Sequence, residues 1–276
     1  MAKNLWVVFA VMILSVNFGC AGKVFKDPTT GLEIEMVYVK GGCYQMGNTF
    51  PENIEDYPTD ELPVHEVCVN DFYLGKYEVT QGQWKKIMGS NPSEESSCGD
   101  NCPVANISWH DAQNFISRLN TGNGGSKYRL PTEAEFEYAQ RSGGRNERYS
   151  GGNNVDRVAW YDKNSVDTSK TELFHKTHPV GTKASNGLGI YDMSGNVWEW
   201  TNDWYGSEYY SNSPRNNPAG PGSGDARVVR GGCASGTVAN MRVSRRDSYA
   251  PDYSFRSIGI RLLRTCWNEA KGSCEP

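Results

Sequence analysis

The chain has 276 residues, which is enough for one large domain or two small ones with a substantial core. Its formal net charge is −4 with both signs mixed, so the sequence carries neither the basic stripe that nucleic-acid binding needs nor a polybasic segment for anionic lipid. Because the chain has 30 glycines, 12% aromatic residues and few long helical periodicities, we expect a loop-rich α+β domain whose irregular segments pack on buried rings.

The N-terminus has the pattern of an export signal. Lys3 precedes an apolar run over residues 5–18, and small residues follow at 19–22. The run is short for a membrane span. Residues 1–20 are therefore predicted to be a signal peptide, with lipidation at Cys20 and ordinary cleavage as alternatives. We expect the mature protein in the bacterial periplasm, or attached to a membrane through lipidated Cys20.

The eight cysteines predict disulfides, because an exported chain enters an oxidising compartment. The strand-like segments CYQMG and HEVCVNDFYL flank a turn-rich loop at 49–63 and are predicted to pair as a hairpin. Cys233 is left unpaired by elimination. Structural zinc is not expected, since the chain has no CxxC unit and only four histidines. The predicted pairs are Cys43–Cys68 across that hairpin, Cys98–Cys102 within CGDNC and Cys266–Cys274 in the tail.

Three helix starts carry a Ser or Thr followed three residues later by an acid or Gln, a pattern that satisfies free N-terminal amides reciprocally. The first two lead into short amphipathic helices. The third carries Phe136 and Ala139 on one face and ends before Gly143, and its acids are expected to face solvent. The three pairs are Thr80 with Gln83, Ser108 with Asp111, and Thr132 with Glu135.

Residues 145–225 are rich in glycine, asparagine, serine and proline, so we expect loops around short strands there. No low-complexity linker or fixed-period repeat divides the sequence, which indicates one domain. The segments RVVRGG and SIGIRLLR are predicted to be strands that meet in a common sheet. Their arginines are expected to orient acidic neighbours: Arg227, Arg230, Arg261 and Arg264.

The segment at 187–205, GLGIYDMSGNVWEWTNDWY, combines three tryptophans with several acids and a Gly-Asn turn. Strand side chains alternate, so Trp198 and Trp200 are expected on one face and Glu199 on the other. Asp192 and the carbonyls of the turn could converge with Glu199 on a hard cation, of which calcium fits best. The alternative is a core tryptophan pair beside a solvated carboxylate.

Seven motifs follow one another along the chain: GGCYQMG, FYLGKYEVTQGQW, PVANISWHDA, YRLPTEAEFEYAQRSGG, GLGIYDMSGNVWEW, RVVRGG and IGIRLLR. In this order they resemble the successive signatures of the sulfatase-modifying factor family, which includes the formylglycine-generating enzymes. The resemblance covers residues 33–264 and leaves 265–276 as a C-terminal tail. It implies a single α+β domain with a variant C-type lectin fold, loop-rich and low in regular secondary structure.

The resemblance implies a particular chemistry. Enzymes of this family oxidise a protein cysteine to formylglycine with oxygen, using copper(I) held by two cysteines after the RGG motif. Gly236 and Met241 stand at those two positions here, so both soft thiolate ligands are missing and copper is not expected. Cys233 and Met241 remain as candidates for non-standard ligation, and a buried core role is the alternative for Met241.

The resemblance also implies structural calcium. Asp192, Gly195, Val197 and Glu199 match the family's calcium-binding turn, through two side chains and two backbone carbonyls. A second family site corresponds to Ala159, Trp160, Glu172 and Phe174.

Two functional hypotheses follow. The first is an exported, calcium-stabilised domain that binds a protein or peptide, or a glycan, and lacks the oxidase chemistry. The alternative is an active oxidoreductase of the formylglycine-generating type with non-standard metal ligation at Cys233 and Met241.

Overall fold

The structure is a computed structural model that describes residues 23–26, 31–50, 59–95, 98–122, 128–168 and 174–265. The predicted signal peptide with Cys20, the predicted pair Cys266–Cys274, and Glu172 lie outside these ranges. The strands are β1 (Lys23–Lys26), β2 (Glu33–Val39), β3 (Gly42–Met46), β4 (His65–Val69), β5 (Phe72–Gly75), β6 (Tyr128–Arg129), β7 (Trp198–Trp204), β8 (Arg227–Arg230), β9 (Arg246–Tyr249), β10 (Ile258–Gly259) and β11 (Leu263–Thr265). The helices are α1 (Gln81–Met88), α2 (Trp109–Gly122), α3 (Glu133–Gln140), α4 (Val155–Val158) and α5 (Tyr209–Asn212), with short 3-10 turns η2 (Thr59–Glu61) and η4 (Val238–Met241).

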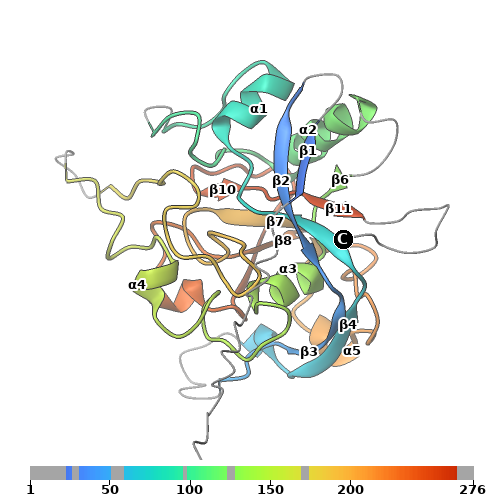
Figure 1. Cartoon of the computed structure of the whole chain (residues 1–276). Coiled ribbons are helices and arrows are strands. Elements are labelled where there is room, and N and C mark those ends of the chain that lie inside the picture. The colour runs from blue at the N-terminus through green and yellow to red at the C-terminus, as the bar shows by residue number, and fades with distance from the viewer. Residues whose placement is uncertain are drawn as a thin grey trace, which may run out of the picture.

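Within the described ranges the strands form three sheets. Their orders are β1-β2-β5-β11-β6, β10-β7-β8-β9 and β3-β4. Figure 1 shows α1 and α2 at one end beside β1 and β2, the β3–β4 hairpin with α5 at the other end, and β7, β8 and α3 between them. The loop-rich α+β architecture expected from composition is confirmed. None of the helices in these ranges is both long and apolar enough to cross a membrane.

The two C-terminal strand segments follow the prediction only in part. RVVR forms β8, and Ile258–Gly259 joins the same sheet as β10 through β7. Leu263–Thr265 instead pairs with β5 and β6 in the five-stranded sheet. The chain therefore passes from one sheet to the other between β10 and β11. Arg261 lies on this crossing with no exposed surface.

The locally encoded elements are confirmed. Thr80 and Thr132 cap α1 and α3 with reciprocal capping boxes. The Ser108 hydroxyl accepts the backbone N–H of Asp111, and the Asp111 carboxylate accepts the N–H of Ser108. Cys43 lies directly opposite Cys68 in the β3–β4 register, and the two form a disulfide. Cys98 and Cys102 form the second disulfide in the described part of the chain, and Cys233 is free and buried, as expected.

The expectation that the acids of α3 face solvent is wrong. Glu133, Glu135 and Glu137 are only 2%, 8% and 0% exposed. The physical reason is that α3 packs between the β3–β4 hairpin and strands β7 and β8, and arginines from other segments supply counter-charges there. The Glu133 carboxylate accepts two hydrogen bonds from Arg246, at 2.9 and 2.7 Å.

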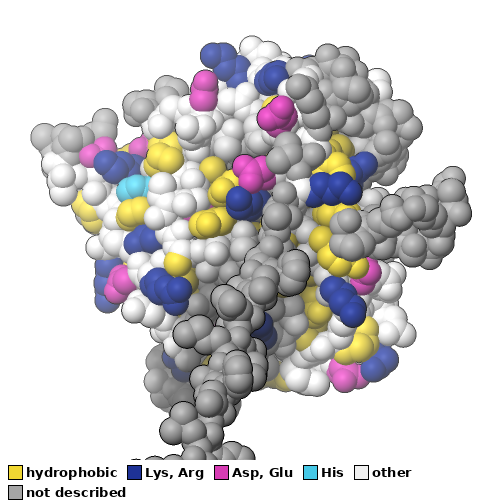
Figure 2. Space-filling model, in the orientation of Figure 1, with side chains coloured by type: hydrophobic (Ala, Val, Ile, Leu, Met, Phe, Trp, Pro, Cys, Tyr) yellow, Lys and Arg dark blue, Asp and Glu magenta, His cyan; other side chains and the backbone are white. Residues whose placement is uncertain are grey.

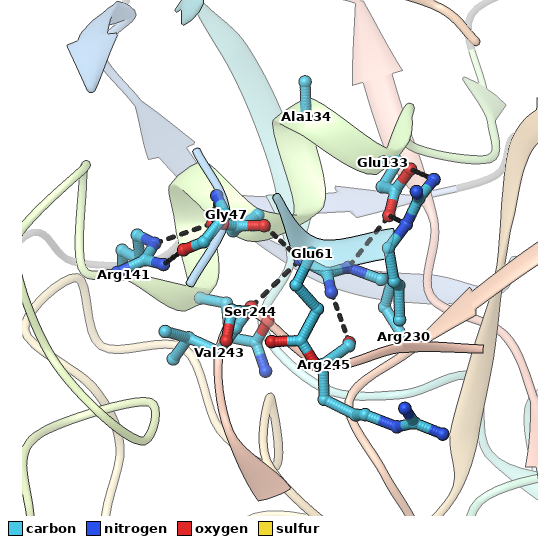
Figure 3. A network of polar contacts seen from close by, with 12 residues as sticks. Gly47, Glu61, Glu133, Ala134, Arg141, Arg230, Val243, Ser244 and Arg245 are labelled. Carbon is cyan, nitrogen blue, oxygen red and sulfur yellow. Dashed lines mark hydrogen bonds and ion pairs between the residues drawn. The ribbon is translucent and has the colours of Figure 1, made fainter. Parts of the chain in front are cut away.

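Glu137 is the centre of a buried ionic network with Gly47, Arg141 and Arg230, three residues that are labelled in Figure 3. Its carboxylate accepts the Arg141 Nε–H at 2.8 Å, the Gly47 backbone N–H at 3.0 Å, and a hydrogen bond from Arg230. Arg230 also donates to two backbone carbonyls that precede β9. The network therefore ties the β3–β4 hairpin, α3, β8 and the segment before β9 into one unit.

Asp203 on β7 is a buried acid beside the same helix, and it provides a pH-dependent prediction. Its Oδ2 accepts the N–H of Glu133 at 2.9 Å. Burial raises the pKa of Asp203 well above its ordinary value, and the charge of Glu133 raises the pKa further. Because the folded pKa is raised, the stability that this group contributes is complete below about pH 4 and is lost as the pH rises through the folded pKa.

We therefore expect Asp203→Asn, which keeps an acceptor oxygen and removes the charge, to melt at a higher temperature than the parent at about pH 8 and at the same temperature at about pH 4. Asp203→Ala loses the acceptor at the helix N-terminus and should melt lower at both pH values. Thermal melting of the three proteins checks this. An Asn variant that is less stable than the parent at about pH 8 would contradict the prediction.

Candidate functional site

The turn before β7 has an unusual backbone. Asp192, Gly195 and Asn196 all have positive φ angles, of 58°, 92° and 66°. Only glycine fits at 195, because a Cβ there would lie 2.3 Å from the carbonyl oxygen of Trp160. Non-glycine residues with positive φ are uncommon, and such backbone strain clusters at ligand sites.

The residues of WEW separate as predicted. Trp198 and Trp200 belong to a hydrophobic core cluster with α1 and α2, while Glu199 faces the other way. Glu199 is fully buried and accepts two hydrogen bonds from Arg261, at 3.0 and 2.8 Å. The expectation that this arginine orients an acid is thus confirmed, and the alternative of a solvated carboxylate is wrong.

A third carboxylate, Glu78, shares this site. It accepts the Asn196 side-chain amide at 2.7 Å and the Val197 backbone N–H at 3.1 Å. Burial raises the pKa of Glu78 well above its ordinary value, and the charges of Asp192 and Glu199 raise it further. The site therefore gathers three acids around the single guanidinium of Arg261.

Of the two side chains in the predicted calcium set, Asp192 has an oxygen without a partner, whereas both oxygens of Glu199 accept from Arg261. Asp192 is 3% exposed, and its Oδ2 accepts the Gly181 N–H at 2.6 Å, while its Oδ1 is buried without a partner. A divalent cation would use that free oxygen and offset the excess negative charge. Within the described ranges no three His, Cys, Asp or Glu side chains converge on one metal position. The candidate set uses two side chains with the carbonyls of Gly195 and Val197.

The backbone carbonyls of the second predicted calcium set, Ala159, Trp160 and Phe174, already accept hydrogen bonds. The carbonyl of Ala159 accepts the Asn164 side chain at 3.0 Å, and that of Trp160 accepts the Asn196 N–H at 3.0 Å. The Phe174 carbonyl accepts the Asp167 N–H at 2.7 Å. These three carbonyls therefore already have donors.

The segment after RGG contains no thiol at either expected copper position. Met241 has no exposed surface, and its Cε lies 3.1 Å from the position that a Cβ on Gly236 would take. The two positions are thus neighbours, filled by a methyl group and a glycine. Cys233 is 4% exposed, with its Sγ 3.4 Å from the Ser235 hydroxyl. Cys233 belongs to the hydrophobic cluster that includes Trp198 and Trp200, and Met241 belongs to a smaller cluster with Tyr149 and Tyr161.

An aromatic row begins at the end of β9 and continues into the segment after it, and it comprises Tyr249, Tyr253 and Phe255. Successive ring centroids are 5.0 and 6.2 Å apart with nearly parallel planes. Tyr253 and Phe255 are 40% and 43% exposed. Arg227, the cross-strand partner of Tyr249, lies over the ring of Trp204 at 3.5 Å. An exposed apolar patch of this kind is typical of an interaction surface.

Comparison with known proteins identifies the family to which the chain belongs. The family described as "Sulfatase-modifying factor enzyme 1-like domain" matches residues 21–266. The chain belongs to this family. It is 29% identical to the chaperone protein LppX of Paenibacillus barcinonensis, over 94% of this chain and 99% of that one. It is 30% identical to the formylglycine-generating enzyme of Streptomyces coelicolor, over 85% and 89% of the two chains. Among solved structures, Treponema denticola variable protein 1 matches with a TM-score of 0.75 and 27% identity, over 88% and 98%.

The sequence motifs of the sulfatase-modifying factor family located the turn at Asp192 and the segment after RGG, but reasoning from the sequence missed Glu78. This residue lies 118 positions before its partner Asn196, so no local pattern joins them. Only its place in KYEVT, an acid between apolar and β-branched residues, hinted at a buried role.

Proposed function

We propose that this member of the sulfatase-modifying factor family is an exported, calcium-stabilised binding domain that lacks the family's oxidase chemistry. Its partner is a protein or peptide, or a glycan, and lipidated Cys20 attaches it to a membrane. The two disulfides of the described part support export, because such bonds persist in oxidising compartments. The basic and acidic side chains interspersed over the face in Figure 2 resemble an ordinary soluble surface more than a nucleic-acid footprint.

The observation that carries the proposal is the contact between Gly236 and Met241. Copper(I) is bound best by soft thiolates, and these neighbouring positions offer a glycine and a buried thioether packed against Tyr161 and Val158. The residues present therefore do not fit the family's copper site. The aromatic row supports the binding role, since Tyr and Arg with exposed faces are enriched where partners dock.

The names of the relatives indicate that proteins of this family have different roles. One relative is called a chaperone and another a formylglycine-generating enzyme. A chaperone binds protein, so that name supports a protein-binding role for this chain as well. The alternative function, an oxidase that uses Cys233 and Met241, would have one thiol and one buried thioether as its soft ligands in place of two thiols.

The test is mass spectrometry of a cysteine-containing CxPxR peptide after incubation with the mature protein, copper and a reductant in air. We expect no formylglycine, beside an active family enzyme as the positive control. Conversion of the peptide would overturn the binding-domain proposal and favour the oxidase alternative.

A gain-of-function variant sharpens this test. Gly236→Cys with Met241→Cys places two thiols at neighbouring positions, and shortening Met241 removes the methyl group that a side chain at 236 would otherwise meet at 3.1 Å. We expect this variant to compete with a chromophoric chelator for copper(I), and the parent not to compete. Equal competition by both proteins would indicate that Cys233 already supplies a copper site.

Calcium binding gives a further prediction. A ligand that binds only the folded state stabilises it, by about 2.7 kcal/mol when its concentration is 100 times its Kd. We expect EDTA to lower the melting temperature of the parent and to leave Asp192→Asn unchanged. The Asn variant keeps an acceptor for Gly181 and loses the free carboxylate oxygen. Glu199→Ala is a poorer probe, because it also leaves Arg261 without its partner.

Asp225→Asn, which changes an exposed acid, is the matched control and should remain sensitive to EDTA. Magnesium in place of calcium tests selectivity, since a site of carbonyl and carboxylate oxygens with few waters favours the larger ion. A parent melting curve that is identical in calcium and in EDTA would refute the calcium site.

A further inference from the structure

Two basic side chains and an aromatic ring form a cluster on the five-stranded sheet. The guanidinium of Arg264 lies over the ring of Phe25, 3.9 Å from its centre, and the ammonium group of Lys23 lies 5.7 Å from the same centre. Phe25 also packs edge-to-face on Tyr73, with 5.2 Å between the ring centres. Lys23 and Phe25 belong to edge strand β1 and Arg264 belongs to β11, so only the fold brings these residues together.

Neither cation of this cluster has an anionic partner in the described part of the chain. Among the described residues, no Asp or Glu forms an ion pair with Lys23 or Arg264. The Nε–H of Arg264 is buried and donates to nothing. Arg129 on β6 and Lys76 next to β5, by contrast, each pair with a glutamate. Because buried donors normally have acceptors, the cluster lacks an anion that would complete it.

The cluster is accessible from outside the protein. Lys23 is exposed, while Phe25 and Arg264 are partly buried. Figure 2 shows basic and apolar side chains next to one another on the face over β1 and β11. Cations beside partly exposed aromatic rings are typical of surfaces that meet the headgroup region of a bilayer, where the rings enter the interface and the cations attract anionic lipid.

The predicted lipid anchor lies next to this cluster in the sequence. Only Ala21 and Gly22 separate Cys20 from Lys23. An extended chain spans at most about 3.6 Å per residue, so the Cα of Lys23 lies within about 11 Å of the Cα of Cys20. Acyl chains on Cys20 would therefore hold the start of β1 at the level of the lipid headgroups.

We propose that the cluster of Lys23, Phe25 and Arg264 binds the anionic headgroups of the membrane to which Cys20 is attached. The two cations contact lipid phosphates, and the ring of Phe25 enters the interfacial region. This inference rests on the membrane attachment in the proposed function and adds which end of the domain faces the lipid. The β3–β4 hairpin and α5 lie at the other end from β1, so they point away from the membrane (Figure 1).

The test measures co-sedimentation of the mature chain carrying Cys20→Ser, which has no thiol to acylate, with large unilamellar vesicles. We expect tighter binding to vesicles that contain phosphatidylglycerol than to vesicles of phosphatidylcholine alone, and weaker binding as salt screens the two charges. Loss of one basic side chain at an anionic surface weakens binding about fivefold. Lys23→Gln and Arg264→Gln should therefore each show a loss of that size.

Arg215→Gln is the matched control, because it removes the same charge from an exposed side chain that pairs with Glu66 on β4. It should bind vesicles as the parent does. Melting curves show that each variant is folded before binding is compared. Equal binding of the parent to the two kinds of vesicle, or parental affinity in both cluster variants, would overturn the assignment. Competition by inorganic phosphate without any binding to vesicles would also overturn it, because it would indicate a site for free phosphate.

Failure of this inference can be distinguished from failure of the proposed function. The mass of the native mature protein reports whether Cys20 is acylated. A mass without acyl chains would refute the membrane attachment and this assignment with it. Absent vesicle binding by a chain whose native form is acylated would refute the assignment alone. Peptide conversion in the oxidation assay would remove the binding-domain proposal and leave the vesicle result to decide the cluster's role.

Discussion

Arg230→Met is expected to reduce the free energy of unfolding by about 3–5 kcal/mol, the cost of breaking a buried ion pair by removing one partner. Arg230 and Glu137 both have no exposed side-chain surface. Without the guanidinium, Glu137 retains only Arg141 as a cationic partner, while the carbonyl of Val243 loses a donor. Methionine fills most of the vacated length, so the loss reports charge and hydrogen bonding more than a cavity. Urea unfolding of both proteins measures the difference.

Two further variants test whether the loss of stability in Arg230→Met comes from breaking a buried ion pair. Combining Arg230→Met with Glu137→Gln leaves the buried guanidinium of Arg141 without its carboxylate partner, so the double variant should be less stable than Arg230→Met alone. Arg215→Ala breaks an ion pair with Glu66 whose side chains are 57% and 47% exposed, and it should cost less than about 1 kcal/mol. An equal loss in Arg215→Ala and Arg230→Met would show that burial does not set the strength of these pairs.

The three helices α1, α2 and α3 and the disulfide hairpin were predictable because their signals are local. The capping box of α1 spans only Thr80 to Gln83, and the hairpin follows from two strand-like segments around Cys43 and Cys68. Such features depend on neighbouring residues whose geometry is fixed by the chain itself. Sequence reasoning therefore located them without knowledge of the fold.

The buried acids of α3 were not predictable in the same way. Glu133 meets Arg246 across 113 positions of sequence, and within the helix its pattern matches an ordinary solvated face. The strand segments after 257 show the same limit, because the choice of sheet for β11 depends on β5 and β6, which lie far away in sequence. Long-range pairing, and not local propensity, decides these positions.

In the candidate site, too, the residues of a local motif were predictable and the residues that only the fold brings together were not. Asp192, the turn at Gly195 and the alternation of WEW could be located from one continuous motif. Glu78 could not, because its partner Asn196 lies 118 positions away in the sequence. A family motif identifies the turn, whereas the electrostatics around it appear only once the fold brings distant carboxylates together.

Removing the Cys43–Cys68 disulfide is the second prediction with a large effect. The bond joins residues 25 positions apart, and the chain-entropy relation gives about 3.5 kcal/mol for a loop of that size against about 2 kcal/mol for the four-position separation of Cys98–Cys102. We expect Cys43→Ser with Cys68→Ser to lose that larger amount, measured by urea unfolding. Cys98→Ser with Cys102→Ser is the matched control.

The β3–β4 hairpin also makes hydrogen bonds to α3, so removing the disulfide should weaken these contacts as well. Tyr44 donates its hydroxyl to the carbonyl of Ala134 at 2.9 Å, and Gly47 donates its N–H to Glu137 at 3.0 Å. Releasing the cross-link frees the strand that carries both donors, so the ionic network of α3 should weaken with it. Adding Arg230→Met to the disulfide-free protein should therefore cost less than it does in the parent. Strictly additive losses would show that the hairpin and the network stabilise the fold independently.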